Sequence, residues 1–201
     1  MIAVEFSEVV RRRRMVRNYT EEPVDDSSLE RIVEAGRRAP SAGFSQGQAF
    51  VVVTDPDQRH ALAKAAGEDE YLEAGFDRWV SRAPALIVLY VSEEIYHRRY
   101  QEADKTGPDG EEIEWPVPYW WVDAGASMQS MLLAAVAEGL AAGFLGSHAV
   151  ADIQSLLRVP DHYRFVGIIT VGHPAPDRRS GSLRRGWKER SKVVHRDRWS
   201  D

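Results

Sequence analysis

The chain has no cysteine among its 201 residues, and this absence removes several classes of protein at once. It excludes a disulfide framework, a thiolate nucleophile, a cysteine-built zinc site and an iron–sulfur cluster. The six histidines form no H-E-x-x-H pair, so we expect no metal site. Long apolar runs are missing too. An uninterrupted run such as Met131–Ala137 ends after seven residues, far short of the ~20 that span a bilayer. With no signal-peptide pattern at the start, the sequence predicts a cytoplasmic protein without a membrane partner.

Lysine is scarce, with four lysines against 22 arginines, and basic residues are concentrated at the two ends. Residues 1–19 carry a net charge of +3 and residues 177–201 carry one of +5. Because the net charge of the whole chain is −5, the segment between them carries −13. Arginine binds phosphate in bidentate fashion, and two basic ends suggest that both reach one phosphate. Solvated ends and a general preference for arginine are the alternatives. A pI near 5.7 argues against a nucleic-acid partner.

The pattern of apolar residues predicts one α+β domain over residues 1–201, because helices outnumber strands and do not alternate with them strictly. A capping box at Ser27–Glu30 predicts the start of a helix that ends before Pro40. Gly143–Gly146 is expected to be a turn into a strand, and Val193–Val194 a short edge strand. The other expected strands cover 49–54, 85–91 and 163–171, and the other expected helices cover 5–12, 57–66, 93–104, 119–142 and 149–157.

Two segments stand outside this core pattern. Residues 92–118 are polar apart from a few aromatics and form an excursion that is either a lid or an idle loop. Residues 177–201 form the basic C-terminal tail.

Two motifs point to chemistry that their context contradicts. Residues 43–47 match G-x-S-x-G, the serine-hydrolase elbow, but Ser45 follows a helix and precedes a strand, the reverse of what the elbow needs. The spacing of Gly139, Gly143 and Gly146 is not a dinucleotide fingerprint, and it follows a helix. We therefore expect neither a serine nucleophile nor a Rossmann site.

Four other features are more informative together. They are the arginine run at 11–17, the small polar turn at 40–46, the small-residue stretch at 142–146 and the basic tail. A turn of this kind lets backbone amides and a glutamine approach a planar ring closely. A phosphorylated heterocycle fits all four.

These residues resemble the FMN-dependent nitroreductase-like flavoprotein family over nearly the whole chain. The opening pattern looks like residues 13–19 (RRMVRNY), and the second like Ala39-Pro40-Ser41 followed by Ser45-Gln46. The helix from Asp123 to Leu140 is similar to the family's dimer helix, and the closing segments 171–174 and 193–195 match in order. The resemblance implies a nitroreductase-like mixed sheet flanked by helices, in an intertwined homodimer with FMN at the interface.

The resemblance also implies site residues. Arg13, Arg14 and Arg17 would hold the phosphate and ribityl chain. Arg185 would reach the same phosphate from the tail, with Arg184 and Lys188 as alternatives. The ring would lie beside Pro40, Ser41 and Gln46, and the backbone of Leu145 and Gly146 would approach its reactive nitrogen. Met15 stands where a serine is common, which removes one hydroxyl contact at the phosphate. The expected substrate-binding residues are Phe44, which replaces a frequent asparagine, Tyr119 and Trp120.

The implied activity is an FMN-dependent NAD(P)H oxidoreductase that passes a hydride through the flavin to a nitroaromatic or quinone by a ping-pong mechanism. No side chain needs to be a catalytic acid, base or nucleophile, since the cofactor carries the chemistry. Two alternatives stay open. One is another flavin reaction on this scaffold, such as dehalogenation, enoate reduction or use of a deazaflavin donor. The other is a non-enzymatic module that binds polyanions.

Overall fold

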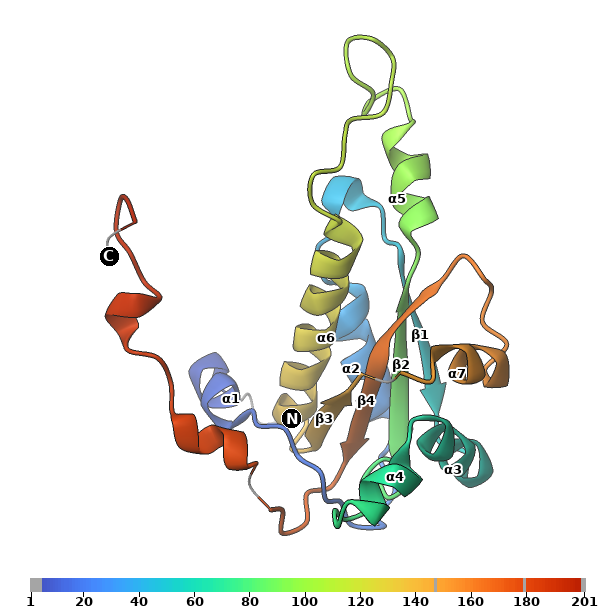
Figure 1. Ribbon diagram of the computed structural model, residues 1–201, viewed down its shortest axis with the longest axis vertical. Helices are drawn as coiled ribbons and strands as arrows, with labels where there is room; N and C mark the ends of the chain where they lie inside the picture. Colours follow the sequence, from blue (N-terminus) through green and yellow to red (C-terminus); the bar gives the residue numbers. More distant parts are fainter. Residues whose placement is uncertain (1–4, 147, 179, 200–201) are drawn as a thin grey trace.

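The computed structural model describes residues 5–146, 148–178 and 180–199. Four strands form one sheet in the order β1-β2-β4-β3 (Figure 1). All three ladders are antiparallel, so the sheet of this chain is not the expected mixed one. Parallel pairing occurs in the described chain as an isolated bridge between Met15 and Ala142. The strands are β1 (Gln48–Val53), β2 (Ala85–Val91), β3 (Ala141–Leu145) and β4 (Arg164–Gly172).

Helices cover both faces of this sheet, which confirms the α+β class. The α-helices are α1 (Phe6–Arg12), α2 (Asp26–Arg37), α3 (Pro56–Ala65), α4 (Glu68–Glu73), α5 (Glu93–Tyr100), α6 (Tyr119–Ala137) and α7 (Val150–Leu156). Short 3-10 turns occur at η1 (Ala42–Phe44), η2 (Gly181–Arg185) and η3 (Arg190–Lys192). None of the helices in the described ranges is long and apolar enough to cross a membrane.

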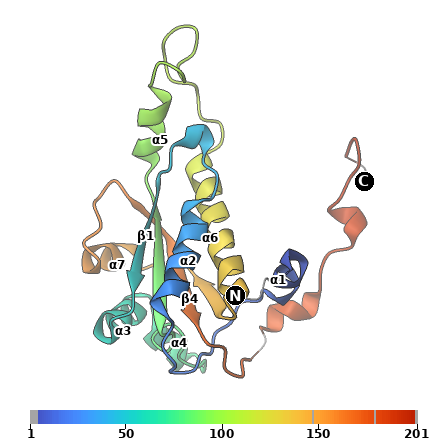
Figure 2. The same ribbon diagram turned by 180° about the vertical axis from the view of Figure 1, so that it is seen from behind.

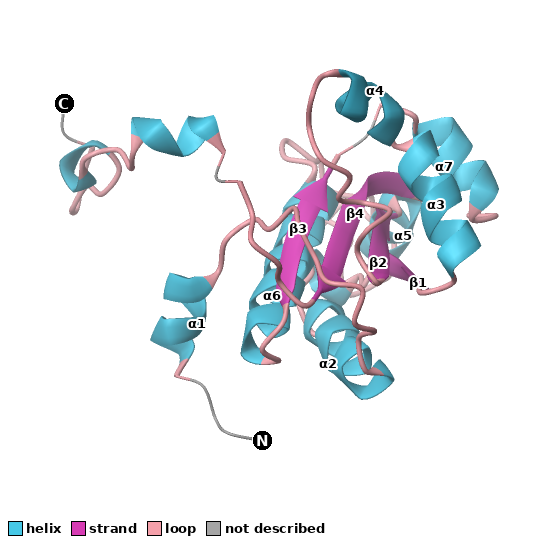
Figure 3. Cartoon of the chain, turned by 90° about the horizontal axis from the view of Figure 1, so that it is seen from below, coloured by secondary structure: helices cyan, strands magenta, loops and turns pink. Residues whose placement is uncertain are grey.

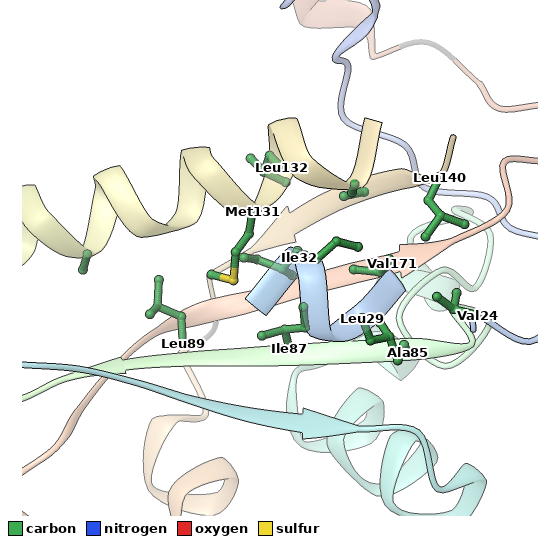
Figure 4. Close-up of a cluster of buried hydrophobic side chains, with 14 of the residues drawn as sticks. Val24, Leu29, Ile32, Ala85, Ile87, Leu89, Met131, Leu132, Leu140 and Val171 are labelled. Atoms are coloured by element: carbon green, nitrogen blue, oxygen red, sulfur yellow. The ribbon is translucent and has the colours of Figure 1, made fainter. Parts of the chain in front are cut away.

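The core has two halves because β2 is buried along its whole length. On one face, Ile32 of α2 and Met131 of α6 pack against Ile87 of β2 (Figure 4). On the other face, Leu62 of α3 and Ile153 of α7 belong to a second buried cluster. Continuous burial explains why β2 reads as an unbroken apolar run rather than an alternating one.

Two parts of the chain leave this body at different places. Helix α5 and the loop that follows it project beyond one end of the sheet (Figures 1 and 2). Helix α1 and the segment after residue 180 extend from the opposite end, both toward the same side (Figures 1 and 3). The two ends that carry the basic residues therefore leave the body in a similar direction.

Several local expectations need correction. Asp25, not Ser27, caps α2, since its side chain accepts a hydrogen bond from the Ser28 amide. The helix expected over 119–142 ends at Ala137, because Gly139 adopts a φ of +77° that few other residues accept. Residues 141–145 are then strand β3 rather than a turn.

Two more corrections concern short elements. Helix α4 was missed, because its six residues are too few for a helical pattern to show. Val193 and Val194 follow η3 and are exposed, with no strand partner in this description of the chain.

Candidate functional site

The arginine strap, residues 13–17, runs from α1 along the edge of β3. The Val16 amide donates to the Ala142 carbonyl at 3.1 Å, beside the Met15 bridge. Gly143 makes this close approach possible, since a Cβ there would lie 2.5 Å from the Val16 carbonyl oxygen. The backbone of the strap is therefore fixed on the sheet, with Val16 buried and the side chains of Arg14 and Met15 exposed.

Contacts at its far end hold the strap in register. The Arg17 amide donates to Asp177 Oδ2 at 2.9 Å, and the guanidinium lies 5.5 Å from the centre of the Trp79 ring. The Tyr19 hydroxyl donates to the Val16 carbonyl at 2.7 Å and pairs with the Thr170 hydroxyl at 2.6 Å. Burial raises the pKa of Tyr19 far above its ordinary value, so the phenol stays a donor.

The strap presents cations that the described protein does not neutralise. Arg13 is half-buried, Arg14 is exposed, and neither has an acidic partner within the described ranges. Met15 beside them is 36% exposed and supplies no hydroxyl. Arginines held in place without a carboxylate are suited to an anionic ligand.

The polar turn, residues 41–46, is a second built feature, between α2 and β1. The Ser41 hydroxyl accepts a hydrogen bond from the backbone amide of Gln46 at 2.9 Å. Three residues of the turn have positive φ, namely Gly43 (60°), Phe44 (58°) and Gln46 (53°). For Phe44 this is a strained conformation, and it leaves the ring 74% exposed. Strain of this kind persists only where surrounding contacts enforce it.

Helices α5 and α6 provide those contacts. The buried carboxylate of Asp123 accepts from the Ala42 amide at 2.8 Å and from the Tyr96 hydroxyl at 2.8 Å. Arg99 donates from Nε to the Gly43 carbonyl at 3.0 Å, while its other nitrogens bind Asp104 at 2.7 Å. Neither residue was expected at the site: Asp123 was noted only as the start of the helix that resembles the family's dimer helix, and Arg99 belongs to no motif.

The arginine strap and the polar turn do not meet within one chain. The turn is anchored at Asp123, near the start of α6, whereas the strap binds Ala142, beyond the end of that helix. The intervening helix spans about 20 Å at 1.5 Å per residue, and Figure 1 shows the two features toward opposite ends of it. The strap and the turn are therefore separate features of the single chain.

The expected ring contact at the end of β3 is open. Leu145 is half-buried and Gly146 is exposed, and a Cβ built on Gly146 would meet no atom within 4 Å. Pro40, at the entrance to the polar turn, is exposed as well. A flat ligand can reach the backbone at both places.

An aromatic cluster joins the excursion, residues 92–118, to the start of α6. Trp115 lies edge-on to Tyr100 and to Trp120, with ring centres 4.5 and 5.8 Å away. Trp120 is only 7% exposed, so it packs inside the cluster and offers a substrate little surface, whereas Tyr119 is 43% exposed. Of the two aromatics expected to bind substrate at the start of α6, Tyr119 is the accessible one.

Within the excursion, His97 of α5 fastens the loop that follows this helix. His97 Nδ1 and Trp115 Nε1 each lie 2.5 Å from Glu112 Oε1. The hydrogen bond to Glu112 raises the pKa of His97, with Glu93 3.5 Å away adding to the effect. Burial alone would raise the pKa of Glu112, but bonds from Trp115 and His97 outweigh it and lower that pKa.

Arg185 and Ser45 are the remaining residues that the sequence singled out. Arg185 lies in η2 on the C-terminal segment and is exposed. Ser45 is buried and its hydroxyl donates to the Ala42 carbonyl at 2.6 Å, so it is a turn residue and not a nucleophile.

The fold and the site define an α+β protein with a cationic strap at one sheet edge and a strained polar turn at the far end of its central helix. Residues 10–173 match the model of the nitroreductase family, and the chain belongs to this family.

Individual relatives agree with this assignment. NADPH-flavin oxidoreductase of Vibrio harveyi is 28% identical over 170 residues, which cover 83% of this chain and 65% of that protein. NADH dehydrogenase of Thermus thermophilus is 29% identical over 182 residues, covering 83% and 85%. The structure of nitroreductase A from Vibrio parahaemolyticus is similar at a TM-score of 0.74 and 25% identity, covering 99% of this chain and 79% of that one. The match thus spans just under two thirds of the Vibrio harveyi relative's length.

Proposed function

We propose that this protein is an FMN-dependent oxidoreductase that takes a hydride from NADH or NADPH and delivers it to an electron-poor acceptor such as a nitroaromatic or a quinone. The observation that supports this most is that the family match, residues 10–173, includes both the arginine strap and the polar turn. Relatives named as NADPH-flavin oxidoreductase and FMN reductase favour the same chemistry.

The residues present fit FMN. Within the described part of the chain, Arg13 and Arg14 are cations without acidic partners, as a phosphate requires, and Gly146 leaves open space where a ring would approach the backbone. Ser41 and Gln46 supply polar groups within the strained turn. Met15 is the one poor contact, because a thioether cannot donate to phosphate.

When bound, FMN would supply the redox chemistry by accepting a hydride and passing it on. The chain's own residues would bind and orient. The strap would hold the phosphate, Phe44 and Tyr119 would give flat substrates an aromatic surface, and the excursion at 92–118 would limit the access of water. Donor and acceptor would occupy one place in turn, which gives ping-pong kinetics.

A homodimer would bring the arginine strap of one subunit to the polar turn of the other. The separation of these features along α6 supports a homodimer. Apolar side chains that are exposed to solvent in the single chain support it as well. Among them are Phe6 of α1 (70% exposed), Val122 of α6 (55%) and Trp187 of the tail (96%). Exposed apolar groups on three separate elements are typical of a surface that a partner covers.

The first test is the absorption spectrum of the purified protein, followed by heat release and chromatography of any yellow cofactor. FMN near one per chain, bleached by NADH or NADPH and restored by a nitroaromatic or quinone, is the expected result. A protein that neither contains nor takes up FMN contradicts the proposal. Bleaching by reduced deazaflavin alone, or turnover of a halogenated phenol alone, would shift it to another flavin reaction.

The phosphate contacts have a direct test. Arg13→Ala and Arg185→Ala are each expected to weaken FMN binding by about 1–3 kcal/mol, the usual effect of losing a charge-assisted hydrogen bond. Arg37→Ala is the control, because this arginine pairs with Glu34 on its own helix. Fluorescence titration measures all three, and unchanged affinity in both test variants refutes the phosphate assignment.

A further inference from the structure

A second basic pocket includes Arg82, which bonds to Asn18 directly after the arginine strap, and neither the phosphate nor the ring of FMN is assigned to this pocket. It opens between the first turns of α3, the loop before β2 and residue Glu21. Its cationic and ionisable lining consists of Arg59, His60, Arg78 and Arg82, against the single carboxylate of Glu21.

The loop that carries two of these arginines is held rigidly. The buried carboxylate of Glu68 accepts the amides of Trp79, Val80 and Ser81 at 2.9, 2.8 and 3.1 Å. From the other side, Arg59 Nη1 donates to the Ser81 and Ala83 carbonyls at 3.0 and 2.7 Å. The backbone between Arg78 and Arg82 is thus fixed from both sides, so the two side chains start from set positions.

Most donors of the pocket are not used by the protein. Arg82 uses one nitrogen, Nη1, to reach Asn18 Oδ1 at 2.9 Å. Arg78 has a single distant ion pair, 3.8 Å from Glu68 Oε2, and its side chain is 52% exposed. The Nη2 group of Arg59 has no hydrogen-bond partner within the described ranges. Three guanidinium groups therefore retain N–H donors for a ligand.

The local charge runs against that of its surroundings. Residues 20–176 carry a net charge of −13, yet this pocket within them gathers three arginines and one acid. Even with Glu68 3.8 Å from Arg78, the three arginines outnumber the carboxylates near them, and an anion between them would relieve their mutual repulsion. A phosphomonoester, with two charges and three acceptor oxygens, matches several guanidinium groups at once.

The pocket is connected to the proposed flavin site through Asn18. The hydrogen bond from Arg82 reaches Asn18, the residue directly after the arginine strap, whose own amide nitrogen Nδ2 donates to the Pro176 carbonyl at 2.7 Å. A ligand that extends from the flavin past Asn18 would bring its far end toward Arg78 and Arg82. A nicotinamide dinucleotide is an extended ligand, and in NADPH the adenosine end carries a 2′-phosphate.

We propose that this pocket binds the 2′-phosphate of NADPH and so makes the protein select NADPH over NADH. The inference rests on the proposed function, since the donor must be a nicotinamide dinucleotide. Arg78 and Arg82 contact the phosphate, and Arg59 both supports the loop and lends its free Nη2 group.

Binding of fragments tests the pocket without any flavin chemistry. By calorimetry, 2′,5′-ADP is expected to bind at least about tenfold more tightly than 5′-AMP, and Arg78→Gln/Arg82→Gln should abolish this difference. Arg37→Gln/Arg98→Gln removes the same charge from arginines paired within their own helices and should keep the difference. Equal binding of the two nucleotides overturns the proposal. Inorganic phosphate that binds as tightly as 2′,5′-ADP overturns it too, because the pocket is then a simple anion site.

Steady-state kinetics supplies the second measurement. The ratio of kcat/KM for NADPH to that for NADH should exceed one in the wild-type protein and fall by about tenfold or more in Arg78→Gln/Arg82→Gln. Thermal melting checks that the variant is folded. A wild-type ratio at or below one contradicts the proposal. If no dinucleotide reduces the flavin but 2′,5′-ADP still binds selectively, the proposed donor fails while the phosphate pocket stands.

Discussion

Glu68 shows how one buried side chain can shape a loop. Its carboxylate is the acceptor for three consecutive amides and is 2% exposed as a side chain. Glu68→Gln keeps the shape but removes the charge that strengthens these bonds, so we expect the free energy of unfolding to fall by about 1–3 kcal/mol. Urea denaturation measures the change. Glu73→Gln, on the exposed side of the same helix, should have no effect, and equal stability of both variants would show that the amides do not need the charge.

Arg99 holds the strained turn through a single donor, the bond from Nε to the Gly43 carbonyl. Without it, the positive φ of Phe44 has less to enforce it, so Arg99→Ala should misplace the ring. We expect KM for the acceptor to rise by about 5–10-fold with a smaller change in kcat, as for a lost positioning contact. Arg99→Lys can restore a donor and should recover part of the loss.

Arg98→Ala is the matched control for this experiment. Arg98 is the neighbouring residue on α5, is 66% exposed and pairs with Glu94 one turn away. It should leave KM unchanged. Equal effects of Arg98→Ala and Arg99→Ala would mean that the turn responds to the net charge of α5 and not to the hydrogen bond.

At the level of elements, the sequence predicts best where one physical cause acts alone. Strand β2 lies where expected, over 85–91, because burial on both faces and flanking breakers define it. The long helix is only partly right, since its apolar pattern continues past Ala137 into residues that pair with β4. Periodicity alone does not separate a buried helix end from a buried strand. The glycine at position 139 was the sequence signal for the end of the helix, because glycine readily adopts the left-handed conformation found there.

Some parts of the candidate site could be predicted from the sequence and others could not. The strap and the turn could be found because their residues form motifs that are local in sequence. Asp123, Arg99 and Glu112 could not, because their partners are 81, 56 and 15 residues away and only the fold brings them together. A buried aspartate in an apolar helix was the one hint, and it reads equally well as an interruption of the pattern.

The excursion after α5 is expected to respond to pH through His97 and Glu112. The pKa of His97 is raised in the fold, so its contribution is full below about 6.5 and is lost as pH rises through the raised value. The pKa of Glu112 is lowered, so its contribution is lost only as pH falls below about 4.5 toward the lowered value. The bond is strongest between these limits.

Hydrogen exchange of residues 101–118, corrected for intrinsic rates, measures this directly. Protection should decrease from about pH 6 to about pH 8.5. His97→Gln should remove the dependence, while His162→Gln, which changes an exposed histidine on another loop, should keep it. A dependence that survives His97→Gln would place the responsible group elsewhere.

For the molecule as a whole, the apolar side chains on the C-terminal segment need a partner. Trp187 is 96% exposed and Leu183 67% exposed in the single chain, which costs free energy unless another surface covers them. Trp187→Asp should therefore weaken dimerisation, measured by light scattering over a range of concentrations. Gln58→Asp adds the same charge on α3, away from this segment, and should leave the mass unchanged. A wild-type protein that is monomeric at micromolar concentration contradicts the dimer.

The distance between the arginine strap and the polar turn leads to a stronger test. If each site takes its strap from one subunit and its turn from the other, defects in the two features should complement each other. Arg13→Ala/Arg14→Ala removes strap cations. Ser41→Ala/Gln46→Gly removes polar groups of the turn, and glycine suits the positive φ of residue 46. Neither homodimer should retain FMN at a concentration that saturates the wild-type protein.

Co-expression with two different tags and purification through both isolates the heterodimer. In it, one site combines both defects and the other combines neither, so about half of the sites should bind FMN, as two-fold symmetry requires. If strap and turn of the same chain served one site, every site in the heterodimer would carry a defect and no FMN would be retained. The FMN content of the heterodimer therefore decides whether the separation along α6 is bridged by a second subunit.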